Sequence, residues 1–171
     1  MRYNASFSTA AKGVTVLLYI ILAALIFNNF VGERESSLGI DRIWVIITGL
    51  VLVVPYLMHV SNYELNSEGI KINTPMRSKR ILFEHIESVT VCSYDQLGIT
   101  IRLFGSGGVW GYFGVFYSRE FGRISFNATS LTRTLILIKG KRKKIIISPD
   151  DTESFIKGMQ DLSPALVSER L

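Results

Sequence analysis

Residues Gly13–Gly32 read GVTVLLYIILAALIFNNFVG, and residues Ile43–Tyr63 read IWVIITGLVLVVPYLMHVSNY. Neither stretch holds an Asp, Glu, Lys or Arg. At about 1.5 Å of rise per residue, a helix of either length crosses the roughly 30 Å hydrocarbon core of a bilayer. The residues between them, Glu33–Arg42, are rich in charge, as is typical of a polar turn. The sequence therefore predicts a two-helix transmembrane hairpin with spans near residues 13–32 and 43–60.

The distribution of Lys and Arg predicts which side of the membrane each part faces. The turn between the two stretches carries Arg34 and Arg42. The opposite side carries more basic residues: Arg2, Lys12, Lys71, Arg77, Lys79 and Arg80. Because basic residues concentrate on the cytoplasmic side, this excess favours cytoplasmic termini and a cytoplasmic C-terminal part. A secretory signal is the alternative interpretation of the first stretch, but a second span follows it, and its end, Phe27–Phe30, lacks a cleavage pattern.

Past Asn62 the hydrophobic period changes from that of helices to that of strands. In most runs apolar and polar residues alternate, which is the pattern of antiparallel strands with one buried face. Thr134–Ile138 is apolar after its first residue, which predicts a strand that is central or close to the membrane. The expected strands are 63–66, 70–73, 80–83, 88–92, 99–103, 123–129, 134–138 and 145–147.

A helix is expected after the last strand. Ser148 stands where it would cap the N-terminus of this helix, and Pro149 would occupy the first helical position. Four apolar residues then recur at three- and four-residue spacing, which puts them on one face that packs on the sheet. They are Phe155, Ile156, Met159 and Leu162. Ser163 and Pro164 end the helix, and a tail follows.

The charges and the single cysteine exclude several functions. After residue 61 there are 15 basic and 11 acidic residues, and this net charge of +4 is too small and too mixed for a nucleic-acid-binding domain. Cys92 is the one cysteine, so the chain has no internal disulfide and no multi-cysteine metal site. The two histidines, His59 and His85, stand in separate segments. We therefore expect no catalytic residues, no metal site, no cofactor and no nucleic-acid partner.

Two groups of basic residues are candidate contact sites. A short turn carries the first group: Lys139, Lys141, Arg142, Lys143 and Lys144. Contact with anionic lipid headgroups is worth about 1 kcal/mol per basic residue near a membrane surface, and a membrane anchor raises the local concentration. The alternative is a solvated hairpin whose charges deter edge pairing. The second group, Arg77, Lys79 and Arg80, either joins such a contact or marks the cytoplasmic side.

The stretch Gly105–Gly122 interleaves glycines with aromatic residues. So many glycines argue against a regular helix. Three of the aromatic side chains form a candidate interaction surface that would dock a peptide or enter the headgroup region: Trp110, Tyr112 and Phe113. The alternative is that these rings belong to the core of the domain.

Four segments, taken with their order and spacing, resemble a known family. They are Tyr63–Ile72 (YELNSEGIKI), Ile81–Val89 (ILFEHIESV), Trp110–Phe116 (WGYFGVF) and Ile145–Asp151 (IIISPDD), the last leading to Phe155. The chain resembles the bacterial membrane-anchored pleckstrin-homology-like (PH-like) domain proteins. The resemblance implies a seven-stranded bent sheet capped by a C-terminal helix, a preceding helical pair and no enzymatic activity.

These observations predict an α+β fold with three parts. Residues 1–62 form the transmembrane hairpin, residues 63–162 a PH-like antiparallel β-barrel or bent sheet of about seven strands with its C-terminal helix, and residues 163–171 a tail. The expected function is that of a non-enzymatic, membrane-anchored binding or assembly module at the cytoplasmic face of a bacterial inner membrane. Its contacts would be protein partners or anionic lipids. The alternatives are an accessory subunit of a larger membrane enzyme or transporter complex, and a structural homo-oligomer.

Overall fold

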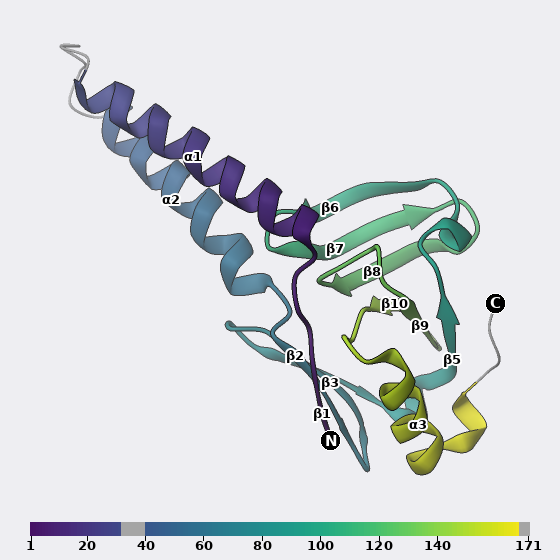
Figure 1. Ribbon diagram of the computed structural model, residues 1–171. Helices are drawn as coiled ribbons and strands as arrows, with labels where there is room; N and C mark the ends of the chain where they lie inside the picture. Colours follow the sequence, from purple (N-terminus) through teal and green to yellow (C-terminus); the bar gives the residue numbers. More distant parts are fainter. Residues whose placement is uncertain (32–39, 168–171) are drawn as a thin grey trace.

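The computed structural model describes residues 1–31 and 40–167. Two helices, α1 (Thr9–Val31) and α2 (Ile40–Met58), lie side by side and project away from a β-rich part that holds most of the remaining chain (Figure 1). Both helices overlap the predicted apolar stretches. Most of the predicted polar turn, Glu33–Arg42, lies outside the described residues.

The apolar side chains of the helical pair face outward rather than into a protein core. Val16, Leu17, Ile20 and Leu50 are each more than half exposed. Within the described part of the chain, Thr9–Asn28 is the one helix long and apolar enough to cross a membrane, and Ile46–Met58 is a shorter apolar helix. The structure thus offers one candidate span by length and composition, and the two-span hairpin stays a prediction.

The N-terminus contributes the first strand of a four-stranded antiparallel sheet in the order β1–β2–β3–β4. These strands are β1 (Arg2–Asn4), β2 (Asn62–Asn66), β3 (Gly69–Asn73) and β4 (Ser78–Leu82). The Met1 ammonium also donates to the Leu65 carbonyl at 2.6 Å. The sequence predicted no strand before the first helix, because three residues without apolar alternation carry no strand signal.

A second sheet has the order β5–β9–β10–β8–β7–β6. Its strands are β5 (Ile86–Cys92), β6 (Thr100–Gly108), β7 (Gly111–Ser118), β8 (Gly122–Ala128), β9 (Leu135–Gly140) and β10 (Lys144–Ile147). β10 runs parallel to β8, so the prediction of a wholly antiparallel sheet was wrong, and about seven strands was too few. The reason is topological: after the β9–β10 turn, β10 runs back between β9 and β8, antiparallel to β9 and therefore in the direction of β8.

The glycine-rich stretch forms the β6–β7 hairpin, for which the sequence predicted no second strand. Gly105 and Gly114 face each other across this hairpin with φ of 111° and 117°. A Cβ on Gly105 would lie 2.1 Å from the carbonyl oxygen of Phe113. The two strands therefore approach closely only because both positions lack a side chain. The prediction that this stretch is not a helix is confirmed.

The central strands of the second sheet, β9 and β10, are buried on both faces, each by its own apolar cluster. The larger cluster joins the two sheets and α3 and includes Tyr63, Leu65, Ile70, Ile72, Ile136, Ile138, Ile145, Ile147, Phe155 and Met159. The smaller cluster includes Leu97, Phe116, Ile124, Phe126, Leu135, Leu137 and Ile146. Alternate residues of β9 enter opposite clusters, so this strand is buried on both faces, as expected of a central strand.

The C-terminal helix, α3 (Thr152–Leu162), begins later than predicted. Asp151 is its N-cap, and the Asp151 carboxylate accepts from the Ser154 N–H at 2.9 Å. Ser148 is not a cap, because its buried hydroxyl accepts from the Thr129 N–H at 2.9 Å instead. Pro149 therefore lies before the helix. The predicted apolar face is confirmed for Phe155 and Met159, which are fully buried.

The first residues of the predicted tail fold back on the second sheet. Pro164–Leu166 forms a short 3-10 turn, and Val167 makes a parallel β-bridge to Val89 of β5. Residues 168–171 lie outside the described residues.

Candidate functional site

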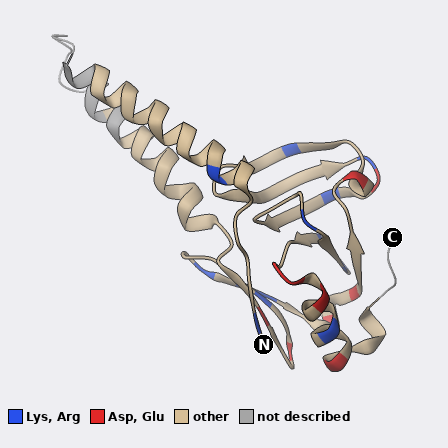
Figure 2. Ribbon diagram, viewed as in Figure 1, with Lys and Arg blue, Asp and Glu red and all other residues tan. Residues whose placement is uncertain are grey.

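Two basic segments that are far apart in the sequence meet beside β4. Burial lowers the pKa of the Lys79 ammonium, and the positive charges of Lys143 and Arg77 lower it further. Lys79 on β4 and Lys143 in the β9–β10 turn therefore lie within electrostatic range of each other. We call the surface that Lys79 shares with this turn the basic edge, made of Lys79, Lys141, Arg142 and Lys143; Figure 2 colours Lys and Arg blue. The other two predicted residues lie elsewhere. Next to Arg77, the Met76 N–H donates to the Leu57 carbonyl at the end of α2 at 3.1 Å, and Arg80 faces the side of β4 opposite to Lys79.

The five predicted basic residues of the β9–β10 turn are of two kinds. The ammonium groups of Lys139 and Lys144 lie over the Phe121 ring, 5.7 and 6.0 Å from its centroid. Lys144 Nζ also donates to the Phe121 carbonyl at 2.7 Å. Lys141, Arg142 and Lys143, at the tip, are exposed. The tip residues are thus open to a partner, whereas Lys139 and Lys144 help hold the hairpin on the sheet.

The strand register shows that this turn lies at the end of the sheet opposite the helices. The Ala128 end of β8 pairs with Tyr112, and the next carbonyl, that of Thr129, accepts from the Ser8 N–H just before α1. The Lys144 end of β10 pairs instead with Ile124, toward the start of β8. The β9–β10 turn therefore points away from the helical pair, as Figure 1 also shows.

The three predicted aromatic residues do not form one exposed surface. Phe113 is 6% exposed, and Tyr112 is half-buried against the smaller cluster. Because successive strand residues face opposite sides of a sheet, these two rings lie on opposite faces of β7. Trp110 lies in the turn of the hairpin, half-buried, where it contacts both helices.

Trp110 joins the tip of the β6–β7 hairpin to both helices. Its backbone N–H donates to Thr15 Oγ1 at 2.9 Å, and its indole N–H donates to the Tyr19 hydroxyl at 2.8 Å. That hydroxyl donates in turn to the Leu52 carbonyl on α2 at 3.4 Å. Three further rings lie with centroids 5.1 to 5.6 Å from the indole: Phe7, Tyr56 and His59. We call this set the joint: Phe7, Thr15, Tyr19, Tyr56, His59 and Trp110.

The backbone of Trp110 is itself unusual. Its φ of 52° lies in the left-handed region, which few residues other than glycine adopt. Such a conformation costs about 1–3 kcal/mol and persists where surrounding contacts enforce it. The sequence singled out Trp110 but not Tyr19, Tyr56 or His59 as its partners, since no local pattern links a turn to two distant helices.

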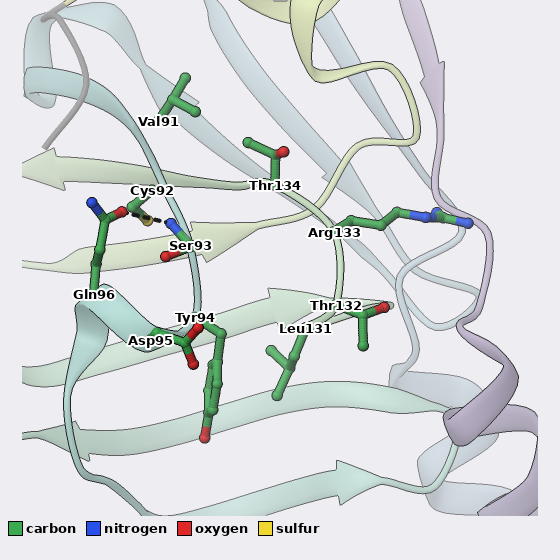
Figure 3. A pocket seen from close by; sticks show the side chains of 10 residues that line it. All are labelled: Val91, Cys92, Ser93, Tyr94, Asp95, Gln96, Leu131, Thr132, Arg133 and Thr134. Atoms are coloured by element: carbon green, nitrogen blue, oxygen red, sulfur yellow. Dashed lines mark hydrogen bonds between the residues drawn. The ribbon is translucent and has the colours of Figure 1, made fainter.

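A cavity of about 670 Å³ lies between two loops of the second sheet, lined by Val91–Gln96 and Leu131–Thr134 (Figure 3). The Ser93 N–H donates to Gln96 Oε1 at 2.8 Å along its wall. Burial raises the pKa of the Cys92 thiol to about 11, so this thiol is protonated at neutral pH and is a poor nucleophile. Arg133 points away from the cavity in Figure 3.

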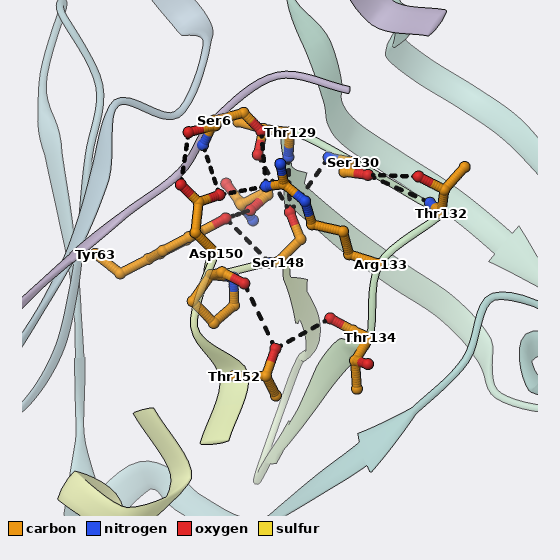
Figure 4. A network of polar contacts seen from close by, with 12 residues as sticks. Ser6, Tyr63, Thr129, Ser130, Thr132, Arg133, Thr134, Ser148, Asp150 and Thr152 are labelled. Atoms are coloured by element: carbon orange, nitrogen blue, oxygen red, sulfur yellow. Dashed lines mark hydrogen bonds and ion pairs between the residues drawn. The ribbon is translucent and has the colours of Figure 1, made fainter. Parts of the chain in front are cut away.

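Arg133 belongs instead to a polar network that ties the N-terminal segment to the end of β10 (Figure 4). Its guanidinium pairs with the Asp150 carboxylate, and that carboxylate accepts from the Ser6 N–H at 2.8 Å and the Ser6 hydroxyl at 2.6 Å. Nearby, the Ser148 N–H donates to the Tyr63 hydroxyl at 3.1 Å. Burial raises the pKa of the Tyr63 phenol. Among the described residues, no group of three or more His, Cys, Asp or Glu could hold a metal ion.

Comparison with known proteins gives one match. The model of a family described as the bacterial PH domain matches residues 61–162, which is more than half of the chain. This segment begins just before β2 and ends with α3, and so covers both sheets apart from β1. No curated protein and no solved structure matched.

Proposed function

This chain belongs to the bacterial PH domain family, and we propose that it is a non-enzymatic binding module anchored in the inner membrane of a bacterium. A domain of this family suggests binding rather than catalysis. The observation that carries the anchoring is the joint, which fixes the β-domain to a pair of outward-facing apolar helices.

In this proposal both α1 and α2 cross the bilayer, and the β-domain lies in the cytoplasm. α2 begins with Ile40, Asp41 and Arg42, so its uncharged part, Ile43–Met58, has 16 residues, about 24 Å at 1.5 Å each. This is shorter than the roughly 30 Å hydrocarbon core, and bilayers accommodate a short span by local thinning. α2 returns beside α1 to the same β-domain (Figure 1), which supports an even number of crossings. The excess of Lys and Arg on the domain side supports its cytoplasmic location.

The basic edge is the proposed contact for an acidic protein partner. Its three tip residues, Lys141, Arg142 and Lys143, are exposed at the end of the sheet away from the helices. A surface so directed meets molecules in the cytoplasm more readily than the headgroups of the membrane that holds the chain. Complementary charge would steer such a partner and favour its orientation.

The test compares partners captured by full-length protein from detergent-solubilised cells. One variant carries Lys141→Ala, Arg142→Ala and Lys143→Ala together. The matched control carries Arg119→Ala, Arg123→Ala and Lys157→Ala, which removes the same charge from other exposed positions. We expect a stoichiometric acidic partner that the first variant loses and the control retains.

Two results would contradict this contact. Either the partner stays with both variants, or wild-type protein captures nothing except copies of itself, which favours the homo-oligomer. If wild-type protein in neutral nanodiscs instead binds added anionic vesicles, and the tip variant does not, the basic edge recognises lipid. A partner that is a membrane enzyme or transporter, retained by the tip variant, supports the accessory-subunit alternative.

The membrane topology has its own test. A reporter fused after Leu171 should be active as a cytoplasmic enzyme and inactive as a periplasmic one. Periplasmic activity would overturn the proposed orientation, and extraction of the protein by alkaline carbonate would overturn the anchoring.

A further inference from the structure

β6 is an edge strand whose apolar side chains are exposed. The exposed fractions are 66% for Ile99 just before the strand, 59% for Ile101, 58% for Leu103 and 72% for Phe104. Tyr117, opposite Ile101 on β7, is 50% exposed. We call these five residues the apolar edge. Contiguous apolar patches mark contacts with proteins or membranes, and a long uncovered edge strand promotes aggregation.

The backbone of β6 is poorly suited to accept another strand. Strand addition needs a regular row of N–H and C=O groups along the edge. In β6 a bulge between Arg102 and Phe104 breaks the register, and bulges of this kind bend and twist the edge. Arg102 also puts a charge in the middle of the strand. The apolar edge therefore offers side chains, rather than backbone groups, to whatever covers it.

β6 itself connects the apolar edge to α1: the edge residues on this strand lie in its first half, and Gly105–Gly108 lead from them to the helix. The far end of β6 touches this helix, since a Cβ on Gly108 would lie 3.7 Å from Val14 Cγ1. Trp110, in the turn between β6 and β7, donates hydrogen bonds to Thr15 and Tyr19. All three helix residues lie within the candidate span Thr9–Asn28. Lipid that covers α1 at this level must therefore also meet the hairpin.

We propose that the apolar edge lies in the headgroup region of the same membrane that α1 crosses. This inference rests on the proposed function, because it requires the helix to be in lipid. Burial of five large apolar side chains favours this position, and a tilt of the helical pair, common among membrane helices, brings the strand toward the bilayer. Arg102 and Lys12, both exposed, extend their charged ends to lipid phosphates.

The experiment measures the depth of a fluorescent label on full-length protein in nanodiscs of phosphatidylethanolamine with phosphatidylglycerol as the minor lipid. Cys92→Ala removes the native thiol, and single cysteines are placed by Phe104→Cys, Ile20→Cys or Glu68→Cys. Ile20 is an exposed residue in the middle of α1, and Glu68 is exposed in the β2–β3 turn. Quenchers are a spin label on the lipid headgroup, a spin label deep in the acyl chain, and aqueous iodide.

We expect the label at 104 to be quenched by the headgroup spin label and protected from iodide, with emission shifted to the blue. The label at 20 should respond to the deep spin label, and the label at 68 to iodide. A label at 104 that iodide quenches freely overturns the inference while leaving the anchor intact. Protection from both lipid and aqueous quenchers also overturns it, since protein then covers the strand. If the label at 20 is quenched by iodide, the proposed function itself fails.

Discussion

The second sheet holds two hairpins that are stabilised in different ways. β9–β10 is rich in Ile, is buried from Leu135 to Ile138 of β9, and ends in an exposed basic turn. β6–β7 is rich in Gly, exposed along its edge and ends in Trp110 held by two helices. Their tips point to opposite ends of the sheet. One hairpin thus draws its stability from its strands and exposes the side chains of its turn, whereas the other is held at its turn and exposes the side chains of its edge strand.

The difference shows how one sheet can serve two surroundings. A strand buried on both faces tolerates a charged turn, because the turn adds nothing to the core. A strand of glycines and exposed apolar residues needs support from elsewhere, and the joint supplies it. The following variants test this contrast, beginning with the largest expected effect.

Leu137→Ala should be the most destabilising of these changes. Leu137 is fully buried in the smaller cluster, and removing a buried Leu side chain costs about 2–5 kcal/mol. Leu103→Ala on exposed β6 is the matched control and should change stability by about 0.5 kcal/mol or less. Denaturant unfolding of the full chain in detergent measures both. Similar losses of stability for the two variants would contradict the proposed difference between the hairpins.

Gly114→Ala should come next. The φ of 117° is unfavourable for Ala, and the new Cβ would lie 2.2 Å from the Phe104 carbonyl oxygen, so we expect a loss of about 1–3 kcal/mol. Gly122→Ala separates the two causes, because Gly122 has φ of 68° but nothing within 4 Å of the new Cβ. If both variants lose the same stability, close approach of β6 and β7 is not what requires glycine.

Trp110→Phe should lower the free energy of unfolding by about 1 kcal/mol. The substitution keeps an aromatic ring but removes the indole N–H that donates to the Tyr19 hydroxyl. Faster amide hydrogen exchange at the tip of β6–β7 should accompany the loss. Tyr19→Phe should have a similar effect, and the double variant should lose less than the sum of the two. Additive losses would show that the two side chains act independently.

The smallest effect should come from pH at Asp150. Partial burial alone would raise the pKa of this carboxyl, but the Ser6 hydrogen bonds and the Arg133 charge together hold it below its ordinary value. A carboxyl with a lowered folded pKa stabilises the fold above its unfolded pKa, about 4, and this stability is lost as pH falls through the folded pKa. We expect a loss of about 1 kcal/mol or less. Asp150→Asn should remove this step in an unfolding titration, whereas Asp161→Asn should retain it.

The sequence predicted well where the signal was local. Apolar runs predicted α1 and α2, alternation predicted most strands, and the spacing of Phe155 and Met159 predicted the buried face of α3. The resemblance in residues 63–162 led to the family that the comparison shows. Prediction from the sequence was wrong where two signals competed. Ser148 and Pro149 matched a helix start, but Ser148 bonds Thr129 across the domain, and the glycines of β6–β7 masked a hairpin because glycine is a poor strand former.

The sequence alone determined that this chain pairs outward-facing apolar helices with a PH-like β-domain, because hydropathy and period are properties of neighbouring residues. Tertiary structure alone decided that Lys79 joins Lys143 in one basic edge, that β10 lies parallel to β8, and that Trp110 fastens the sheet to both helices. Each of these depends on contacts between residues distant along the chain. Such contacts form only when the whole core closes, so no local pattern encodes them.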